Sequence, residues 1–474
     1  MPRIGIIGSG FGATAVAAEF LRHGYSDVRL WERSAAIGGV WRDNIYPGAA
    51  CDVPSPFYSF SFAPSKLWPR RYAEQPDILA YLRAVAHREG VASRTRLSTE
   101  VRGAQWSGTA WNVRFADGTH EEVDVLISAV GQLSNPAIPA IPGAESFQGP
   151  AFHSAQWPAG LDLTGRRVSV IGAAATAVQA VPQLAPIAER VTLYQRTPNY
   201  IWPKPDGRYP LWYRPFAARI ERPFFQWLGE QFSRALEDGS FAARVSRSVT
   251  RFHLRRQVAD PALRAALTPD YPIGCRRILF SNNFYPALCR ENVDLVTEGI
   301  ARIRPDGIET IEGAFHHADA IVYATGFDAQ GFLRGIIVTG SDGVDLHQHW
   351  AQGARAHLGI YVPGFPNLLL SYGPNTNLGG SSIIRMLEAQ ASHMRQSVDY
   401  MVSTGAKTLE ATESAEQAWD NAVQGALSTS AWTRCDSWYR DPGSGRITSN
   451  WPGGTTSYVE RTRVLEPSEF TFGR

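Results

Sequence analysis

The chain lacks a large excess of charge of either sign. Its 474 residues include 46 basic and 44 acidic side chains, which leaves a formal net charge of +2. Proteins that hold nucleic acid or an anionic membrane by charge carry a stronger basic excess. The overall balance therefore gives no electrostatic signature for either partner. Only three of the basic residues are lysines, which we attribute to genome bias rather than to chemistry.

The sequence also has few cysteines and no long apolar run. No run is long enough to span a bilayer, and the start of the chain lacks the apolar segment and cleavage site of a signal peptide. Cys51, Cys275, Cys289 and Cys435 show neither C-x-x-C nor C-x-x-x-x-C spacing, so neither a redox disulfide nor a zinc site is expected. These absences predict a reduced, soluble, cytoplasmic protein without a membrane span or a metal.

The first positive signal is a nucleotide-binding pattern at the start of the chain. An apolar run, Ile4–Ile7, predicts a buried parallel strand, and Gly8, Gly10 and Ala13 follow as G-x-G-x-x-A before a helical apolar period. A second apolar strand ends in Glu32. Glycines at such a turn admit a pyrophosphate, and the acid accepts hydrogen bonds from a ribose hydroxyl. The strand, helix and acid together predict a unit suited to FAD.

A second unit of the same kind begins near residue 166. Its strand leads into Gly172, and Arg196 stands at the same offset from Gly172 as Glu32 does from Gly8. An acid at this place would repel a 2′-phosphate, whereas arginine pairs with it, so this unit suits NADPH. A solvated surface arginine is the alternative. Ala174 replaces the expected second glycine, and its methyl crowds the pyrophosphate approach.

The fold class follows from these two units. Two further segments, Asp124–Gly143 and Ala318–Ala329, each carry an apolar strand that ends in a small-residue turn. Their positions indicate that the second unit is inserted into the first. We predict an α/β protein with two Rossmann-like dinucleotide-binding domains, one for FAD and one for NADPH, plus a helical insertion.

Five residues in the connection between the two units carry a family resemblance. The segment FQGPAFHSAQWP places its residues at F-x-G-x-x-x-H-x-x-x-W-P spacing: Phe147, Gly149, His153, Trp157 and Pro158. This resembles the fingerprint of Baeyer–Villiger monooxygenases, which are NADPH-dependent, FAD-containing class B monooxygenases. Similar segments at 38–55, 271–288, 373–390 and 435–454 extend the resemblance over nearly the whole chain. It implies an enzyme that uses NADPH and O2 to form an FAD peroxide and inserts oxygen next to a ketone carbonyl, giving an ester or lactone.

The expected division of the chain combines the two motifs with this resemblance. The predicted parts are 1–145 for the first part of the FAD domain, 146–165 for the linker with the fingerprint, 166–205 and 270–330 for the NADP domain, 206–269 for a helical insertion, and 331–474 for the second part of the FAD domain with a C-terminal control loop.

The resemblance also assigns the catalytic charges. Arg277 takes the place of the active-site arginine, Arg276 that of the 2′-phosphate contact, and Asp52 that of the acid that positions the arginine. Arginine stabilises an anion without giving up a proton, as this chemistry requires. If the segment is extended, the two arginines point to opposite faces. Without the resemblance, an exposed arginine pair and a turn-capping aspartate explain the same residues.

The remaining cofactor contacts are implied by the resemblance. The expected FAD contacts are Gly8, Gly10, Phe11, Gly12, Ala13, Glu32, Gly39, Val40, Trp41, Asp52, Val53, Tyr58 and Val101. The expected NADP contacts are Gln132, Gly172, Thr176, Gln179, Arg196, Thr197, Arg276 and Trp438.

Three further segments have expected roles. His153 is predicted to be a hinge between the domains rather than a base, since the reaction removes no substrate proton. Gly379–Ser382 precede a predicted helix whose positive end would face the flavin, although an ordinary helix start explains them equally well. The insertion at 206–269 is predicted to be helical, with an apolar stripe that faces inward and walls the substrate cavity; a membrane-surface helix is the alternative.

Other functions remain open. The same flavin chemistry could oxygenate sulfur or nitrogen, although the family resemblance implies that Trp157 favours ketone oxidation. A pyridine-nucleotide disulfide reductase is opposed by the lack of a suitable cysteine pair, and a non-catalytic flavoprotein by Arg276, Arg277 and Asp52. The sequence leaves open the ketone, the stereochemistry and the oligomeric state.

Overall fold

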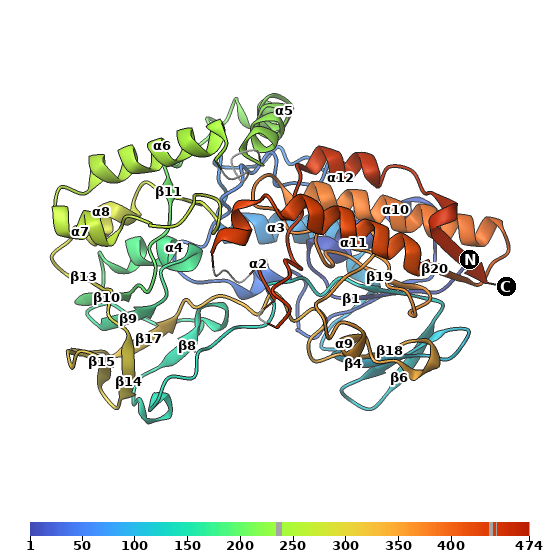
Figure 1. The fold of residues 1–474 in the computed structure, drawn as a ribbon, viewed down its shortest axis with the longest axis horizontal. Helices are drawn as coiled ribbons and strands as arrows, with labels where there is room; N and C mark the ends of the chain where they lie inside the picture. The colour runs from blue at the N-terminus through green and yellow to red at the C-terminus, as the bar shows by residue number, and fades with distance from the viewer. Residues whose placement is uncertain (234–238, 436–438, 442, 474) are drawn as a thin grey trace.

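The computed structural model describes residues 1–233, 239–435, 439–441 and 443–473. Two five-stranded parallel sheets form the centres of two lobes (Figure 1). The first sheet has the order β19-β7-β1-β2-β3, with β1 (Ile4–Ile7), β2 (Val28–Trp31), β3 (Thr95–Arg96), β7 (Val125–Ser128) and β19 (Leu368–Leu370). The second has the order β13-β10-β9-β17-β8, with β8 (Ala151–His153), β9 (Arg167–Ile171), β10 (Arg190–Tyr194), β13 (Val293–Val296) and β17 (Ala320–Tyr323). All strands of the second sheet therefore lie between β7 and β19 in sequence.

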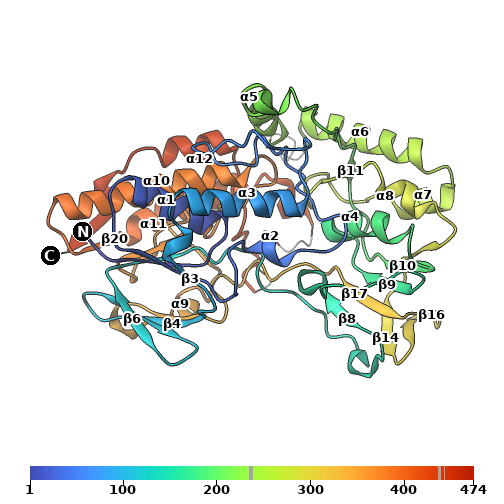
Figure 2. The same cartoon turned by 180° about the vertical axis from the view of Figure 1, so that it is seen from behind.

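Helices cover the central strands, which explains their continuous apolar sequences. Every residue of β1 is buried, as expected for a parallel strand covered on both faces. In the first lobe, α1 (Phe11–Arg22) packs against α3 (Gln75–Arg88) and against α10 (Ile383–Ser403), which is far away in sequence (Figure 2). In the second lobe, α4 (Ala175–Leu184) packs against α8 (Phe284–Leu288).

Smaller elements complete the two lobes. The remaining strands are β4 (Val101–Trp106), β5 (Trp111–Phe115), β6 (His120–Val123), β11 (Ile201–Trp202), β12 (Leu279–Phe280), β14 (Ile300–Arg304), β15 (Gly307–Thr310), β16 (Phe315–His317), β18 (Ile337–Thr339), β20 (Thr408–Ala411) and β21 (Phe470–Gly473). The remaining helices are α2 (Val40–Asp43), α5 (Arg214–Ser233), α6 (Phe241–Gln257), α7 (Pro261–Ala266), α9 (Leu346–His349), α11 (Glu413–Leu427) and α12 (Thr455–Arg461).

The same kind of turn follows β1 in the first sheet and β9 in the second. Gly8 has φ +113°, and a Cβ there would lie 2.6 Å from the carbonyl oxygen of Ala129. Gly172 has φ +105°, and its Cβ would lie 2.4 Å from the carbonyl oxygen of Ala324. Both positions therefore require glycine, for conformation and for space. The predicted strand–turn–helix units are present in both lobes.

The fingerprint segment is part of the second sheet rather than a simple connection. Its residues 151–153 form β8, which pairs with β17 so that His153 lies beside Tyr323. Gly149 comes just before this strand, and a Cβ there would lie 2.3 Å from the carbonyl oxygen of Asp319. Trp157 is buried, and its ring meets that of Phe152 edge-on at 5.1 Å. The segment thus fixes one edge of the second sheet.

The insertion is helical, as predicted, but the expected direction of its apolar stripe is wrong. On α5, Phe216, Ile220, Phe224 and Trp227 are exposed to solvent. The inner face of α5 buries Ala217, Glu221 and Phe225 instead. The periodicity of the sequence predicts an apolar stripe on this helix. It does not tell whether the stripe faces the core or the solvent, because both faces carry apolar residues.

A substitution at Gly149 tests the packing of the fingerprint. We expect Gly149→Ala to lower the free energy of unfolding by about 2 kcal/mol, because the new methyl overlaps a backbone oxygen that cannot rotate away. Gly425 on α11 has open space around it, so Gly425→Ala should raise stability by up to about 1 kcal/mol. Urea unfolding of both variants measures the difference, and equal effects would contradict the packing described.

Candidate active site

A salt bridge joins the two lobes at the predicted catalytic residues. The Nη2 atom of Arg277 lies 2.6 Å from both carboxylate oxygens of Asp52, although the residues are 225 positions apart in sequence. The Arg277 side chain remains 45% exposed and that of Asp52 18% exposed. The Asp52 carboxylate raises the pKa of Arg277 further above its ordinary value, against the opposing effect of desolvation. The structure therefore holds a permanent, solvent-accessible positive charge between the lobes.

The two adjacent arginines point to different surroundings. Arg276 lies in a bend and Arg277 in a stretch without regular secondary structure just before β12, so the condition of an extended strand is not met. The Arg276 guanidinium lies over the ring of Tyr271, 5.3 Å from its centroid. The Tyr271 hydroxyl donates to the carbonyl oxygen of Pro198 at 2.9 Å. Arg276 thus lies on the side of the loop that follows β10, and this loop also carries Arg196.

The loop that carries Asp52 is fastened to α4 of the other lobe. The Tyr46 hydroxyl donates to Oε1 of Gln179 at 2.8 Å, and Nε2 of Gln179 donates to the carbonyl oxygen of Ala50 at 2.9 Å. Burial raises the pKa of Tyr46 to about 12, so this tyrosine stays protonated. Gly48 touches the same helix, and a Cβ there would lie 2.5 Å from the carbonyl oxygen of Gln179. Gln179, expected to contact NADP, therefore also joins the lobes.

Small residues form a cradle at the predicted flavin turn. A Cβ at Gly39 would lie 3.0 Å from Cα of Gly10, so the two backbones come together at this point. A Cβ at Gly12 would lie 2.9 Å from Oγ of Ser371, just after β19. This Ser371 hydroxyl is buried and has no hydrogen-bond partner in the described part of the chain. A backbone-lined turn with an unpartnered hydroxyl fits a pyrophosphate-containing dinucleotide.

Glu32 lies at the carboxyl end of β2, where a ribose-binding acid is needed. Its side chain is buried and accepts hydrogen bonds from the Ser9 hydroxyl at 2.6 Å and from the backbone N–H of Ser34 at 2.9 Å. Nη1 of Arg42 lies 3.0 Å from Oε1. These contacts fix the carboxylate, whose two oxygens still offer acceptor positions for a ribose.

Aromatic residues line the region beside the cradle. The Trp41 indole N–H donates to the Tyr58 hydroxyl at 3.1 Å, and the Tyr58 and Phe11 rings meet edge-on at 5.3 Å. Burial raises the pKa of Tyr58 well above its ordinary value, so its hydroxyl stays neutral. By contrast, Val101 lies in the hydrophobic core with Trp31, away from this aromatic group in the packing of the first lobe. Its role as an FAD contact stays a prediction.

The turn between β9 and α4 shows why Ala174 is tolerated where a glycine was expected. Ala174 caps α4 with φ −86° and ψ −157°, close to the φ −82° and ψ −164° of Gly10 at the start of α1. Its backbone is therefore unstrained, and its methyl is exposed at the turn. Arg196 is exposed beyond the end of β10, and Thr197 beside it is half-buried. The turn and the nearby arginine fit a dinucleotide with an added phosphate.

His153 is held as a neutral ring between the fingerprint and the loop after β17. It is fully buried, its Nε2–H donates to the carbonyl oxygen of Gly326 at 2.9 Å, and its Nδ1 accepts from the backbone N–H of Ala155 at 3.2 Å. Burial lowers the pKa of His153. Both ring nitrogens are thus used, which suits a structural role between segments and leaves neither nitrogen to serve as a base.

Three residues near the salt bridge were not anticipated from the sequence. Nζ of Lys204 donates to the carbonyl oxygen of Cys51 at 3.3 Å, and burial lowers the pKa of Lys204. The buried Tyr439 and the half-buried Tyr372 both interact electrostatically with Arg277. The scarcity of lysine was an available signal for Lys204, whereas no motif marks the two tyrosines.

The remaining predicted site residues lie as follows. The amide of Gln132 donates to the carbonyl oxygen of Tyr372 at 3.2 Å, close to the salt bridge. Ser382 occupies the N-cap position of α10 without a capping hydrogen bond from its side chain. Its buried hydroxyl has no hydrogen-bond partner among the described residues. Thr176 lies on α4 within hydrogen-bonding reach of Tyr46. Trp438 lies outside the described residues.

The expectation that the cysteines are reduced is wrong for one pair. Cys275 and Cys435 form a disulfide with their Cα atoms 6.2 Å apart, across 160 positions of sequence. Cys51 is free and buried, and Cys289 is free and exposed. Local spacing rules missed this pair because the fold brings its members together from distant segments. Since Cys275 directly precedes the arginine pair, the bridge ties the active-site turn to the C-terminal region.

Comparisons with known proteins decide the family. A Baeyer-Villiger monooxygenase of Streptomyces coelicolor is 39% identical over 99% of this chain and 92% of its own length. A Baeyer-Villiger monooxygenase of Pseudomonas aeruginosa is 38% identical over 99% of this chain and 91% of its own. The chain belongs to the Baeyer–Villiger monooxygenase family. The fold class and the enzyme class expected from the sequence are thereby confirmed.

Other comparisons agree with this assignment. Residues 49–219 match a family model described as pyridine nucleotide-disulphide oxidoreductase, and residues 6–74 match an NAD(P)-binding Rossmann-like domain. A solved structure titled oxidized steroid monooxygenase bound to NADP is 30% identical, covers 100% of this chain and 99% of its own, and has a TM-score of 0.91. Each of the two family models covers less than half of the chain. Within the described residues, no helix has the length and apolar character needed to cross a membrane.

The disulfide gives a prediction for this monooxygenase. Reduction, or Cys435→Ser, should lower the free energy of unfolding by up to about 4 kcal/mol, because the bridge closes a very long loop of the unfolded chain. Peptide mapping without reductant should recover Cys275 and Cys435 in one linked pair. Cys289→Ser is the matched control and should change neither result. Recovery of four alkylated thiols from protein denatured without reductant would contradict the pairing.

Proposed function

We propose that this chain is an NADPH- and O2-dependent flavoprotein monooxygenase that converts a ketone into an ester or lactone at the Arg277–Asp52 pair. The observation that carries the proposal is a permanent positive charge, fixed by a carboxylate and still accessible, between two dinucleotide-binding lobes. Oxygen insertion next to a carbonyl passes through negative charge on oxygen. A fixed guanidinium stabilises such charge without protonating it.

The cofactors expected from the sequence, FAD and NADPH, are confirmed at the level of the family. A curated relative in Aspergillus niger is named an FAD-binding monooxygenase, and a solved structure at 27% identity is titled as a complex with FAD and NADP. In this chain, the cradle at Gly10 and Gly39 with Glu32 fits FAD, and the turn at Gly172 with Arg196 fits NADPH. When bound, the reduced flavin supplies the electrons that activate dioxygen.

The residues around Arg277 each have a proposed task. Asp52 holds the guanidinium in place through both of its oxygens. Burial raises the pKa of Tyr439 to about 12, so this neighbour stays neutral and adds no negative charge beside the arginine. Gln132 fixes the backbone of Tyr372 at the edge of the site. Together these residues keep the positive charge oriented while substrate and dioxygen react.

The finer assignments of cofactor contacts and domains are part of the same proposal. Arg196 and Arg276 bind the 2′-phosphate of NADPH, supported by the Tyr271–Pro198 contact that places Arg276 beside the loop after β10. The fingerprint acts as a hinge between the domains. The neutral His153, whose two ring nitrogens are both hydrogen-bonded, supports this role. The proposed domains are centred on the two parallel sheets at the bounds expected from the sequence, except that β8, within the expected linker, is a strand of the second sheet.

The compartment and partners follow from the cofactor. We place the enzyme in the cytoplasm, where NADPH is available, with a small ketone and O2 as its reaction partners. A disulfide in that compartment is commonly transient or redox-sensing, so the oxidation state of Cys275 and Cys435 in cells is a relevant observation.

Cofactor selectivity tests the phosphate assignment. We expect Arg196→Ala and Arg276→Ala each to raise the KM for NADPH roughly tenfold or more, because each removes a charge-assisted contact with the phosphate. The KM for NADH, which lacks that phosphate, should change little. Steady-state kinetics with both coenzymes measures the effect, and Arg190→Ala on the exposed start of β10 is the control. Equal losses for NADPH and NADH would refute the assignment.

An isotope experiment tests the function itself. The FAD-loaded enzyme is incubated with NADPH, a panel of cyclic and aryl ketones, and isotopically heavy dioxygen. One heavy atom should appear in the ring or bridging oxygen of the ester, with none in the carbonyl. Consumption of NADPH with hydrogen peroxide as the only product for every ketone would reject ketone oxidation. Sulfoxide formation from an added sulfide, without any ester, would favour the heteroatom-oxygenating alternative.

A further inference from the structure

An exposed apolar stripe runs along α5. Phe216, Ile220, Phe224 and Trp227 recur at helical spacing and are all exposed, with Trp227 58% accessible. Leu211, Trp212 and Leu228 beside them are exposed as well. Burial of the opposite helix face explains how α5 stays attached to the protein, but nothing in the described chain covers the stripe.

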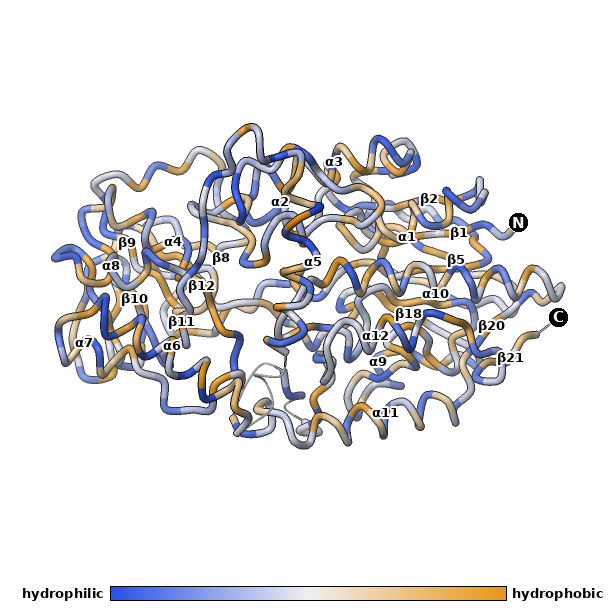
Figure 3. Tube along the Cα trace, turned by 90° about the horizontal axis from the view of Figure 1, so that it is seen from above, coloured by the Kyte–Doolittle hydropathy of each residue, from blue (hydrophilic) through white to orange (hydrophobic). Residues whose placement is uncertain are grey.

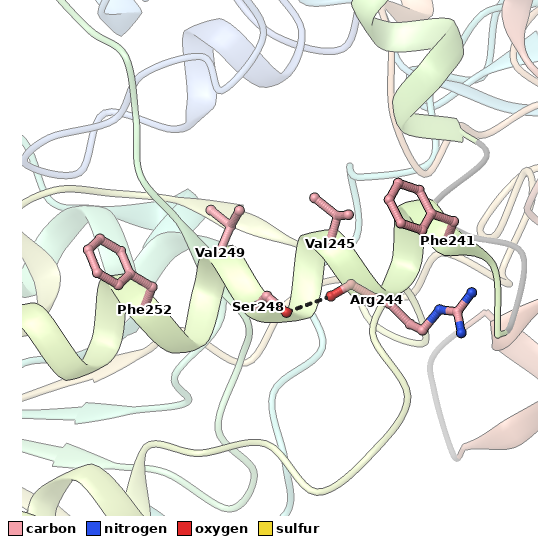
Figure 4. Close-up of a pocket in the computed structure, with 6 residues that line it drawn as sticks. All are labelled: Phe241, Arg244, Val245, Ser248, Val249 and Phe252. Atoms are coloured by element: carbon pink, nitrogen blue, oxygen red, sulfur yellow. Dashed lines mark hydrogen bonds between the residues drawn. The ribbon is translucent and has the colours of Figure 1, made fainter.

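A second stripe with the same spacing runs along α6. Phe241 is 75% exposed and Phe252 66% exposed, with Val245 and Val249 between them on the same side. Figure 4 shows these four side chains projecting from one side of the helix and Arg244 projecting from another. Both helices lie along the same edge of the molecule in Figures 1 and 2, and apolar and polar residues alternate along each when it is seen from above (Figure 3).

The stripes are unusual for the surface of this protein. Of the 23 large apolar side chains that are exposed in the described part of the chain, ten lie between residues 211 and 252. Single exposed apolar residues are normal, whereas a concentration of this kind marks a surface that contacts something apolar.

Among the described residues of α5 and α6, the exposed charges are all of one sign. The exposed charged side chains on the described residues of α5 and α6 are arginines: Arg219, Arg244, Arg251, Arg255 and Arg256. The acids of α5 are used internally, since Glu221 pairs with Arg71 and Glu230 with Arg385. At 100° per residue, Arg244, Arg251 and Arg255 fall along one border of the α6 stripe. Thus a locally basic border exists within a chain whose net charge is only +2.

We propose that α5 and α6 form a docking surface for an anionic phospholipid bilayer. Helices that lie in the membrane interface combine Phe, Trp and Leu on one face with arginine or lysine at its border, as these two do. The apolar side chains would enter the acyl boundary, and the arginines would contact lipid phosphates. Lysine and arginine near such a surface contribute to binding individually, so a local cluster acts even when the whole chain is nearly neutral.

A second copy of the chain fits this surface less well. In a two-fold symmetric pair, the same patch meets itself, so the arginine border of α6 would face an identical arginine border. Like charges in such a contact oppose association, and the two helices offer no exposed acid among their described residues to compensate. Nucleic acid would satisfy the arginines but not the aromatic and aliphatic stripe. A bilayer with anionic headgroups satisfies both features.

Vesicle flotation of the FAD-loaded protein tests the proposal. The probes are vesicles of phosphatidylcholine alone and of phosphatidylcholine with phosphatidylglycerol. We expect binding to the anionic vesicles that falls with added salt, and weaker binding to the neutral ones. The triple variant Phe241→Ser, Val245→Ser, Phe252→Ser should bind roughly tenfold more weakly. The triple variant Arg244→Gln, Arg251→Gln, Arg255→Gln should lose the preference for anionic vesicles, with binding at least roughly tenfold weaker.

A matched control removes three exposed apolar side chains from other surfaces: Ile138→Ser, Ile337→Ser, Val464→Ser. It should float as the unmodified protein does, and the unfolding midpoint of each variant shows that the fold is kept. Failure of the unmodified protein to bind either vesicle would overturn the proposal, as would an equal loss in the control. A dimer that becomes monomeric in the α6 apolar variant, with no vesicle binding, would assign the surface to a second copy.

Discussion

The salt bridge between Asp52 and Arg277 is the interaction on which the active site depends. It joins a loop of the first lobe to a turn of the second, and both oxygens of one carboxylate contact one guanidinium nitrogen. An arginine held in this way keeps its charge at every physiological pH and cannot act as an acid. Its position is therefore defined only when the two lobes are correctly placed, so the reaction is coupled to the geometry of the whole molecule.

Other contacts between distant segments maintain that geometry. Gln179 fastens α4 to the loop that carries Asp52, and His153 fastens the fingerprint to the loop after β17. The bridge between Cys275 and Cys435 adds a covalent tie beside the arginine turn. Besides its proposed role as a hinge, the fingerprint supports the site: its glycine permits close backbone packing, and its histidine and tryptophan fill buried positions.

Much of the fold could be predicted because its signals are local. Gly8 and Gly172 each adopt a conformation that favours glycine and lie against a carbonyl oxygen, so the motif reports a physical requirement of the turn. The pairing of Arg277 with Asp52 was expected only through the family resemblance, and the structure bears it out. No local motif marks the disulfide or Tyr439, because their partners are distant in sequence, and the scarcity of lysine was the available signal for Lys204.

The apolar stripe of α5 shows a different limit of prediction from sequence. The period of α5 reveals that one face is apolar, but whether that face meets the core or the solvent depends on the packing of the other face. Glu221 illustrates this: a charged residue is buried because Arg71 and Tyr209 satisfy it, and Phe216 and Phe224 on the other face are exposed. Sequence patterns that assume apolar residues inside will misplace such a helix.

The most direct test of the central claim is the amount of ester formed per NADPH oxidised by Arg277→Ala, with Arg277→Lys and Asp52→Asn alongside. If the fixed charge stabilises the oxygen-inserting step, NADPH oxidation continues in Arg277→Ala while ester formation falls about 100-fold or more and hydrogen peroxide takes its place. Arg277→Lys should retain part of the activity, and Asp52→Asn should lie between the two. Ester yield per NADPH equal to that of the unmodified enzyme in Arg277→Ala would contradict the account.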